Sequence, residues 1–201
     1  MDERVERGMR RQLAGLPADR IGWKIALNAP ALMDALGLDE PGLGFLTRAR
    51  VAEGEHSLAG SSQPAVEPEL VLEAGEGGTV ARLGAALEVV DFDRPLDDVE
   101  EVMASNIFHR AVAFGALAAS VSPGEAVFRV NEEERAVVSA FEAPADTLAF
   151  VSRFLRGLGR ELAAGDLVIA GALAPAAPVA PGDVAALEIA GLGSVSLAFT
   201  P

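Results

Sequence analysis

Residues 66–73 read VEPELVLE, and this stretch decides how the chain folds. Its valines and leucines favour a β-strand, which a glycine-rich turn at 75–78 ends. Side chains two positions apart in a strand point to the same face, so Glu67 and Glu69 face the same way. Pro68 between them cannot donate a ladder hydrogen bond, which indicates a sheet edge or a bulge that a ligand can approach. The stretch therefore predicts a β-sheet core with two carboxylates on one face.

A third glutamate lies in the next predicted strand. Residues 85–90 read AALEVV, so Glu88 interrupts a run that otherwise reads as fully buried. A buried carboxylate is costly unless it is paired or bound to a cation. Together with Glu67 and Glu69 it would form a hard oxygen site for Mg²⁺ or Mn²⁺, with positions left for water and substrate. Salt bridges from these glutamates to arginines are the alternative explanation.

The rest of the chain predicts a few helices around further strands. The predicted helices, recognised by apolar spacing, proline starts and glycine ends, cover residues 2–14, 30–37, 96–104 and, capped by Asp146, 146–159. The further predicted strands cover residues 21–27, 107–114, 126–130, 135–141, 167–170, 184–189 and 194–199, with loops and brief strands over 41–65. Asn131 marks a hairpin tip. The predicted fold class is α+β, with residues 1–20 as an N-terminal helical segment and residues 21–201 as one β-rich domain.

The composition restricts the class of protein. The chain has 201 residues, a formal net charge of −14 and 50% hydrophobic residues, so it is too apolar for a disordered acidic tail. The acidic excess argues against nucleic acid or an anionic membrane as a partner. Without cysteine there is no disulfide and no thiolate metal site. No apolar run is long enough to span a membrane, and the charged N-terminus is unlike a signal peptide, so a cytoplasmic protein is expected.

One lysine stands out among the basic residues. Lys24 is the only lysine, because fifteen of the 16 basic residues are arginine. Lysine differs from arginine in being a compact point charge. A lysine in a chain whose other basic residues are all arginine is therefore a candidate for a role that arginine cannot fill, such as catalysis. Chance is the alternative. The two histidines are weaker candidates, since His56 lies in a polar loop and His109, in a predicted strand, is expected to be structural.

Four motifs follow one another along the chain. They are Gly22-Trp-Lys24, Glu67-Pro-Glu69 with Glu88-Val-Val90, Gly171-Ala-Leu-x-Pro175, and Pro181-Gly-Asp183. Their order resembles that of the 2-keto-4-pentenoate hydratases and 4-oxalocrotonate decarboxylases, a group of the fumarylacetoacetate hydrolase superfamily, from about residue 20 to the C-terminus. The resemblance implies a mixed β-roll like the C-terminal domain of that superfamily, with a few peripheral helices. It also implies a Mg²⁺ or Mn²⁺ ion held by Glu67, Glu69 and Glu88, with Lys24 as the active-site lysine.

The chain also departs from the pattern of that group. Ala49 stands where the hydratases have an acidic residue, Phe108 where they have a hydroxyl, and Ala170 where they have a threonine. Each change removes a group that handles water or protons, and proton-transfer groups contribute roughly 10²–10⁴-fold to a rate. The resemblance thus implies a divergent member that keeps the metal and the lysine. Ordinary dienoate hydration is expected to be weak.

Two functions of different classes follow. The first is a divalent-metal-dependent lyase on a small 2-oxo acid, in which the metal polarises the 2-oxo group and stabilises an enolate. Decarboxylation is expected slightly ahead of hydration, with Lys24 complementing the negative charge or moving a proton. Arg48 and Arg50 are predicted to hold a second substrate carboxylate bidentately. The second function is that of a catalytically silent relative, a ligand-binding or partner subunit.

The two functions differ in whether a new group replaces the lost acid–base residues. Glu53, Glu55 and His109 are the candidates for that position. In either case the chain is expected to self-associate as a dimer or larger, because the apolar segment 172–180 leaves hydrophobic surface to cover. A related decarboxylase or hydratase subunit is a further candidate partner.

Overall fold

The computed structural model describes residues 2–119 and 122–201. The helices are α1 (Glu3–Ala14), α2 (Pro30–Leu36), α3 (Val99–Ala104) and α4 (Pro144–Gly157), with short 3₁₀ turns η1 (Arg48–Arg50) and η2 (Glu76–Gly78). The strands are β1 (Arg20–Ala26), β2 (Gly42–Thr47), β3 (Glu55–Ser57), β4 (Pro64–Ala74), β5 (Val80–Asp91), β6 (His109–Phe114), β7 (Ala118–Ala119), β8 (Ala126–Val130), β9 (Glu133–Val138), β10 (Leu167–Ala172), β11 (Ala177–Pro178), β12 (Val184–Ile189) and β13 (Gly193–Thr200). The elements match the expected α+β composition.

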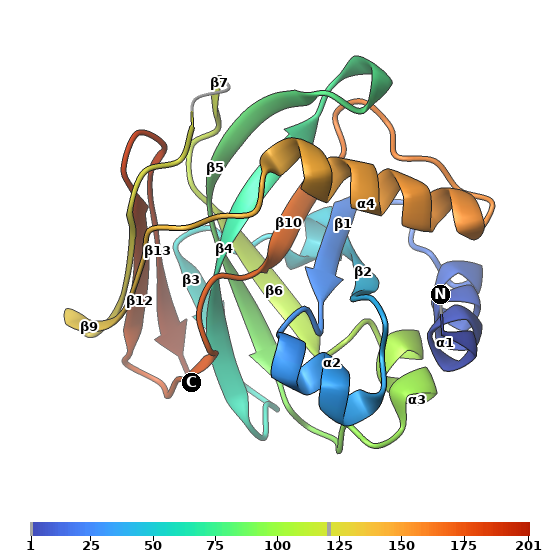
Figure 1. The fold of residues 1–201 in the computed structure, drawn as a ribbon. Helices are drawn as coiled ribbons and strands as arrows, with labels where there is room; N and C mark the ends of the chain where they lie inside the picture. Colours follow the sequence, from blue (N-terminus) through green and yellow to red (C-terminus); the bar gives the residue numbers. More distant parts are fainter. Residues whose placement is uncertain (1, 120–121) are drawn as a thin grey trace.

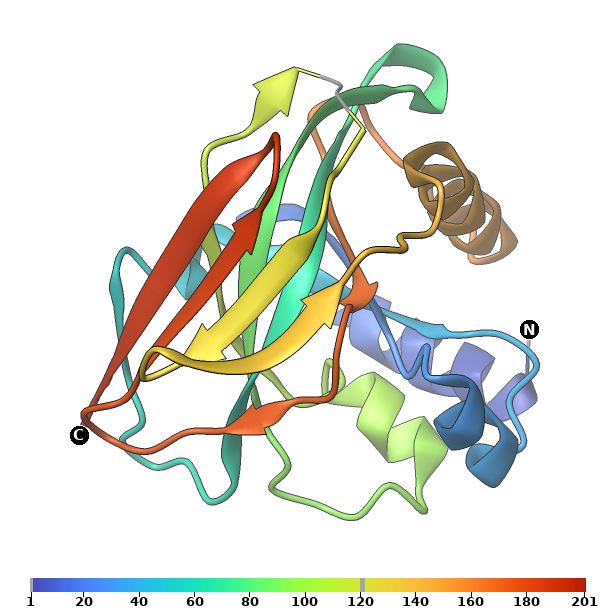
Figure 2. The same cartoon turned by 60° about the vertical axis from the view of Figure 1, so that its left-hand side comes forward.

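The strands form two sheets (Figure 1). The larger runs in the order β2-β1-β10-β4-β5-β6, with β11 paired to β4 and β7 paired to β5. The smaller runs in the order β3-β13-β12-β8-β9. Both are mixed, because β1 is parallel to β10 and β13 is parallel to β3, while the other pairs are antiparallel. Figure 2 shows the smaller sheet on one side of the larger sheet and the helices gathered on the other, which confirms a mixed β core with peripheral helices.

The hairpin of β4 and β5 forms the centre of the larger sheet. Both strands are buried along most of their length, with Val71 and Leu87 each 0% exposed. Strands buried on both faces read as nearly continuous apolar runs, which is the pattern of residues 66–73 and 85–90. The antiparallel register places Glu67 directly opposite Glu88. The pairing of these two strands therefore brings together glutamates that lie far apart in the sequence.

Helix α1 packs against α3 and shares the core of the β-rich part. Its buried side chains Val5, Met9 and Leu13 belong to the same hydrophobic cluster as the strand residues. Gly8 allows the close approach of the two helices, since a Cβ there would lie 2.5 Å from the carbonyl oxygen of Glu100. The N-terminal helical segment is thus attached to the domain by burial of one apolar face.

The start of α4 corrects the sequence analysis. The helix begins at Pro144, its N-cap residue is Ala143 without a side-chain cap, and Asp146 lies in the first turn instead of capping. Proline suits the first turn because its φ is already helical and its missing N–H would have no partner there. The apolar face predicted for this helix is present, with Leu148, Val151 and Phe154 buried. Proline, not aspartate, sets the helix start.

Pro68 does not mark a sheet edge, because β4 lies between β5 and β10. A bulge lies next to it and not at it: the register of β10 against β4 shifts between Ile169 and Ala172, which pair with Val71 and Glu69. The carbonyl oxygen of Pro68 accepts a hydrogen bond at 2.8 Å from the N–H of Leu173, which lies beyond β10. A strand residue directs its N–H and C=O to the same side, so Pro68 makes one hydrogen bond to this segment and lacks the second that an N–H would donate.

Two predicted strands are shorter than expected. The strand predicted over 107–114 begins at His109, because Asn106, Ile107 and Phe108 all have positive φ. The strand predicted over 135–141 is β9 and ends at Val138. Within residues 2–119 and 122–201, none of the helices has the length and apolar character needed to cross a membrane.

Gly22 lies where β1 and β10 pack closely together. A Cβ at this position would lie 1.9 Å from the carbonyl oxygen of Leu167, and neighbouring backbone cannot move aside. Gly22→Ala is therefore expected to lower the free energy of unfolding by about 3 kcal/mol, at the upper end of overpacking effects. Urea unfolding followed by the fluorescence of the single tryptophan, Trp23, measures this loss.

Gly15→Ala is the matched control for Gly22→Ala. The nearest atom to a Cβ at Gly15 is 3.9 Å away, and the residue lies at the end of α1, so the free energy of unfolding should change by no more than about 0.5 kcal/mol. A Gly22→Ala variant with an unchanged urea midpoint would contradict the close strand contact.

Candidate metal centre

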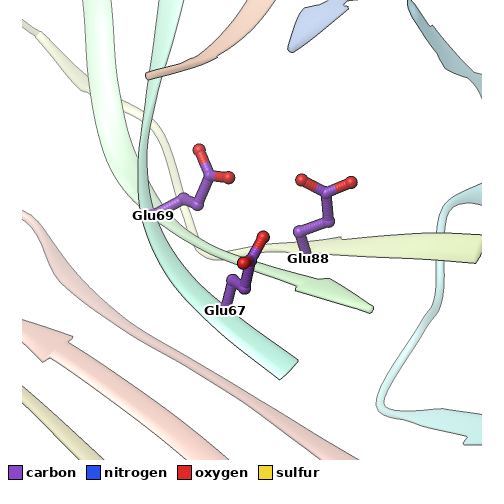
Figure 3. Close-up of side chains that lie close together, drawn as sticks. All are labelled: Glu67, Glu69 and Glu88. Carbon is purple, nitrogen blue, oxygen red and sulfur yellow. The ribbon is translucent and has the colours of Figure 1, made fainter. Parts of the chain in front are cut away.

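Three glutamates from the central hairpin meet at one point. Each of Glu67, Glu69 and Glu88 offers a carboxylate oxygen, and these three oxygens lie within 4.8 Å of one another. Figure 3 shows the three side chains turned toward the same space, two from β4 and one from β5. Glu69 and Glu88 are 0% exposed, while Glu67 is partly exposed. The structure thus brings together the carboxylates that the sequence selected as metal ligands.

The hydrogen bonds at this centre leave two carboxylate oxygens without a partner. Glu88 Oε1 is shared by the ammonium group of Lys24 and by His109 Nδ1, the latter at 2.8 Å. Glu69 Oε2 accepts the N–H of Gly171 at 2.7 Å. Within the described residues, Glu69 Oε1 and Glu88 Oε2 are buried with no hydrogen-bond partner. Buried unpaired carboxylate oxygens are costly, so these atoms fit the requirement of a hard cation for oxygen ligands.

The charges at this centre are not balanced by the protein alone. Burial, together with the neighbouring Glu88, raises the pKa of Glu67 to about 7, although Lys24 opposes the shift. Burial and the other two glutamates also raise the pKa of Glu69. Burial opposes ionisation of Glu88, but Lys24 and His109 hold its pKa below the usual range. When all three carboxylates are ionised, they outnumber the one ammonium group, and a divalent cation would compensate the excess of negative charge.

His109 supports Glu88 from inside the core. Its ring is 0% exposed, and burial lowers its pKa, so the neutral ring donates from Nδ1 to Glu88. A carboxylate ligand is commonly oriented by such an outer hydrogen bond. The expected structural role of His109 agrees with this contact. His109 does not line the cavity beside this centre. It therefore does not supply, from the cavity wall, an acid–base group in place of those that the chain lacks.

Lys24 is held in place by an unusual turn. Asn106, Ile107 and Phe108 have φ values of 64°, 50° and 62°, a left-handed conformation that is strained for a β-branched residue such as Ile107. The carbonyl oxygen of Ile107 accepts a hydrogen bond from Lys24 Nζ at 3.0 Å. The side-chain amide of Asn106 bonds both the N–H and the C=O of Phe45, at 2.8 and 3.0 Å. The strained turn therefore fixes the lysine beside Glu88.

Two glycines permit this arrangement. A Cβ at Gly44 would lie 2.8 Å from Lys24 Cγ, so β2 needs a residue without a side chain at that position. Gly171 has a φ of +96°, and this conformation directs its N–H to Glu69. A Cβ at Gly171 would also lie 2.5 Å from the amide nitrogen of Asn28. Gly171 belongs to one of the sequence motifs, but no local pattern indicates its bond to Glu69.

A cavity of about 680 Å³ opens beside the metal centre. Lys24 and Glu67 form part of its wall, and Asn28 and Glu142 are the other polar residues there. The remaining wall is largely apolar and includes Leu27, Leu32, Val90, Phe92, Leu96, Ile107, Phe108, Leu173 and Pro175. Such a mixture of apolar wall and a few polar groups is typical of small-molecule sites. Sequence reasoning missed Glu142, which is an exposed residue in the connection before α4 and carried no local signal.

The structure does not bring the predicted arginines to this cavity. Arg50 and the neighbouring Ala49 line a separate depression of about 380 Å³, together with Glu53 and Glu55. Arg50 donates to the carbonyl oxygen of His109 at 2.6 Å, and Arg48 lies exposed in η1. The predicted contact of these arginines with a second substrate carboxylate gains no support from this placement. Glu53 and Glu55 likewise lie outside the cavity.

The fold and the buried glutamates beside a lysine define a class of protein. No family model matches the chain. Among solved structures, 4-oxalocrotonate decarboxylase from Pseudomonas putida G7, complexed with magnesium and adipate, is similar with a TM-score of 0.80 and 24% identity, over 94% of this chain and 81% of that chain. The chain therefore has the fold of the fumarylacetoacetate hydrolase superfamily, as the sequence predicts.

Sequence relatives narrow the class. The TodF product hydratase of Pseudomonas putida is 31% identical in an alignment that covers 89% of this chain and 76% of the relative. A 2-keto-4-pentenoate hydratase of Burkholderia vietnamiensis is 33% identical in an alignment that covers 90% of this chain and 78% of the relative. The chain belongs to the 2-keto-4-pentenoate hydratase and 4-oxalocrotonate decarboxylase group of that superfamily. These relatives are lyases, and the prediction of a lyase-type enzyme is confirmed at that level.

Proposed function

We propose that the chain is a divalent-metal-dependent lyase that acts on a small 2-oxo acid by hydration or decarboxylation. The observation that carries this proposal is the pair of buried, unpartnered oxygens, Glu69 Oε1 and Glu88 Oε2, beside a cavity lined by Lys24 and Glu67. The names of the relatives support the reaction class, and the magnesium in the solved decarboxylase supports the choice of ion.

Glu67, Glu69 and Glu88 would hold Mg²⁺ or Mn²⁺, which when bound supplies Lewis acidity for polarising a 2-oxo group. Glu69 is kept in place by Gly171, and Glu88 by Lys24 and His109. These outer contacts keep the carboxylates facing one another before an ion arrives. Because the ligands lie on two paired strands, their spacing does not depend on a flexible loop.

Lys24 is the proposed catalytic residue. Its ammonium group has three donors, of which one is used by Glu88 and one by the carbonyl oxygen of Ile107, so one donor remains for a substrate in the cavity. A fixed positive charge at this point stabilises negative charge that develops on a substrate oxygen. Among the described residues that line the cavity, only Lys24, Glu67 and Glu142 are titratable, so Glu142 becomes a candidate for the proton transfers that hydration needs.

The proposal is tested with purified protein loaded with Mn²⁺. We expect turnover of 2-hydroxypenta-2,4-dienoate or of 2-oxohex-3-enedioate. Loss of absorbance and release of CO₂ measure this turnover. Treatment with EDTA should abolish it. Oxalate, which imitates the head of a 2-oxo acid, should bind the loaded protein in calorimetry. Oxalate binding without turnover of either compound would favour the catalytically silent relative, and no binding at all would overturn the site itself.

The association of the chain stays a prediction. Val137 and Val184 are 48% and 42% exposed on the smaller sheet, which is consistent with a surface that another chain covers. Self-association, and a related decarboxylase or hydratase subunit as a partner, are both part of the proposal. Light scattering at micromolar concentration distinguishes a monomer from a dimer or larger assembly.

A further inference from the structure

We propose that Arg50 is a positioning residue for the metal centre, which it reaches through His109. The inference rests on the proposed function, because it assumes that Glu88 is a ligand of a divalent cation. Arg50 is one of the two arginines predicted to hold a substrate carboxylate, and the structure gives it a different partner. Three observations carry the inference: the bond from Arg50 to the backbone of His109, the segment that holds Arg50 beside β6, and the bond from the His109 ring to Glu88.

Two arginines converge on the backbone of His109. His109 begins β6, and the register of β6 against β5 shifts between Val89 and Val90 at that point. Such an irregularity interrupts the ladder and makes a carbonyl oxygen available to other donors. Nη1 of Arg50 donates to the carbonyl oxygen of His109 at 2.6 Å, and Nη1 of Arg110 donates to the same oxygen at 3.3 Å. Arg50 is therefore the closer of the two donors.

In the part of the chain that the structure describes, Arg50 differs from Arg110 in having no carboxylate partner. Arg110 donates from Nη2 to Asp93 at 2.6 Å and lies 3.6 Å from Asp91, so carboxylates hold its guanidinium group. Hydrogen bonds with a charged donor are stronger than neutral ones. The short bond from Arg50 is thus the stronger of the two restraints on the His109 carbonyl group.

The backbone that carries Arg50 is fixed against β6. Arg50 ends the 3₁₀ turn η1, and the next residue, Val51, forms a parallel bridge with Val112. The N–H of Ala52 donates to the carbonyl oxygen of Val112 at 2.9 Å. The segment after η1 therefore lies beside β6, which is an end strand of the larger sheet. Arg50 thus extends from a backbone that is already held close to the oxygen it binds.

The ring of His109 extends this restraint to the metal centre. It is 0% exposed, and its Nδ1 donates to Glu88 Oε1 at 2.8 Å. The residue before it, Phe108, has a left-handed φ of 62°, a conformation that persists only where its surroundings hold it. Arg50 holds the peptide group that follows this turn. Without Arg50, the His109 ring should keep its direction less well, and Glu88 would lose part of its support as a ligand.

Calorimetric titration of EDTA-treated variants with MnCl₂ tests the inference. Loss of an outer-shell partner costs about 10–100-fold in metal affinity, and Arg50 lies one step farther out, so Arg50→Met should weaken Mn²⁺ binding by about three- to tenfold. Removing a positive charge near a cation site would by itself strengthen binding, so the expected sign excludes a purely electrostatic effect. Arg50→Lys keeps a charged donor and should recover most of the affinity.

Arg48→Met is the matched control. Arg48 lies exposed in the same 3₁₀ turn, and its substitution removes the same charge without touching His109. Its affinity for Mn²⁺ should be that of wild type or slightly higher.

A double-mutant cycle tests the route through His109. His109→Phe keeps a buried ring but removes the donor to Glu88. Each single change should weaken Mn²⁺ binding, whereas Arg50→Met should add no further loss in the His109→Phe background. Two independent effects would instead give losses that multiply. The single variants of Arg50 decide the inference even where His109→Phe does not fold.

Urea unfolding of the same samples separates positioning from a merely structural role. A structural arginine would lower the urea midpoint of Arg50→Met, while the folded protein bound Mn²⁺ as wild type does. That result, tighter binding, or losses that multiply would overturn the inference and leave the proposed function standing. If wild-type protein does not bind Mn²⁺, the proposed function fails and the inference fails with it.

Discussion

Glu69→Gln is expected to weaken the binding of Mg²⁺ or Mn²⁺ by 100-fold or more, since loss of an outer-shell partner alone costs about 10–100-fold in metal affinity. The substitution keeps the shape of the side chain and can keep an acceptor for the N–H of Gly171, but it removes the charge and the unpartnered oxygen. Titration of the EDTA-treated protein with MnCl₂ in a calorimeter measures the change.

Thermal unfolding gives an independent reading of the same variant. At a metal concentration of 100 times Kd, an ion that binds only the folded state adds about 2.7 kcal/mol to stability. Wild-type protein should therefore gain thermal stability in millimolar Mn²⁺, and Glu69→Gln should gain almost none. Without metal the variant should be no less stable than wild type, because it removes a buried carboxylate whose pKa is raised.

Glu133→Gln is the control for these measurements. Glu133 is exposed at the start of β9, where it pairs with Arg135 at 3.0 Å, so metal affinity and stability should both stay as in wild type. If Glu69→Gln retained the wild-type affinity for Mn²⁺, the three glutamates would not be the metal site.

Lys24→Met is expected to reduce turnover by about 10³-fold while the metal still binds, in line with the loss of one preorganised donor at developing charge. Without metal, the variant leaves Glu88 buried without its ammonium partner, and we expect a loss of about 3–5 kcal/mol in the free energy of unfolding. Added Mn²⁺ should restore part of that stability, because the ion supplies positive charge to the same carboxylate. Rate assays and urea unfolding, each with and without Mn²⁺, measure both effects.

Arg82→Met separates this effect from a general loss of positive charge. Arg82 lies on β5, the strand of Glu88, but its side chain is 51% exposed and pairs with Glu73 at the surface. Its turnover should be that of wild type, and its stability should change by no more than about 1 kcal/mol. A Lys24→Met variant with wild-type turnover would remove the lysine from the mechanism.

Local sequence was sufficient for much of the fold. The apolar runs at 66–73 and 85–90 predicted β4 and β5, because strands buried on both faces need apolar side chains throughout. The period of two along a strand placed Glu67 and Glu69 on one face before any contact was known. Asn131, with a φ of 53°, lies at the tip of the β8–β9 hairpin, as its tolerance of the left-handed conformation predicts.

The pairing of strands that are distant in the sequence decided which residues meet at the metal centre and the cavity. Lys24 meets Glu88 because β1, β10, β4 and β5 are neighbours in one sheet, an order that no local pattern encodes. The same order leaves Arg50 at a separate depression and Arg48 exposed, although both follow β2 directly. The connection before α4 brings Glu142 to the cavity from a distant part of the chain. Side-chain periodicity reports only which face of its own strand a residue occupies.

Residue type and spacing along one element were enough to predict the strands, the same-face glutamates and the importance of the single lysine. Which charges meet, which carboxylate oxygens stay unpartnered and which residues line the cavity depend on contacts between elements that are distant in the sequence. The turn at Asn106–Phe108 shows the reason. Its left-handed backbone is unfavourable in isolation, and it persists because the Asn106 amide bonds Phe45 and the Ile107 carbonyl bonds Lys24, contacts that exist only once the sheet has formed.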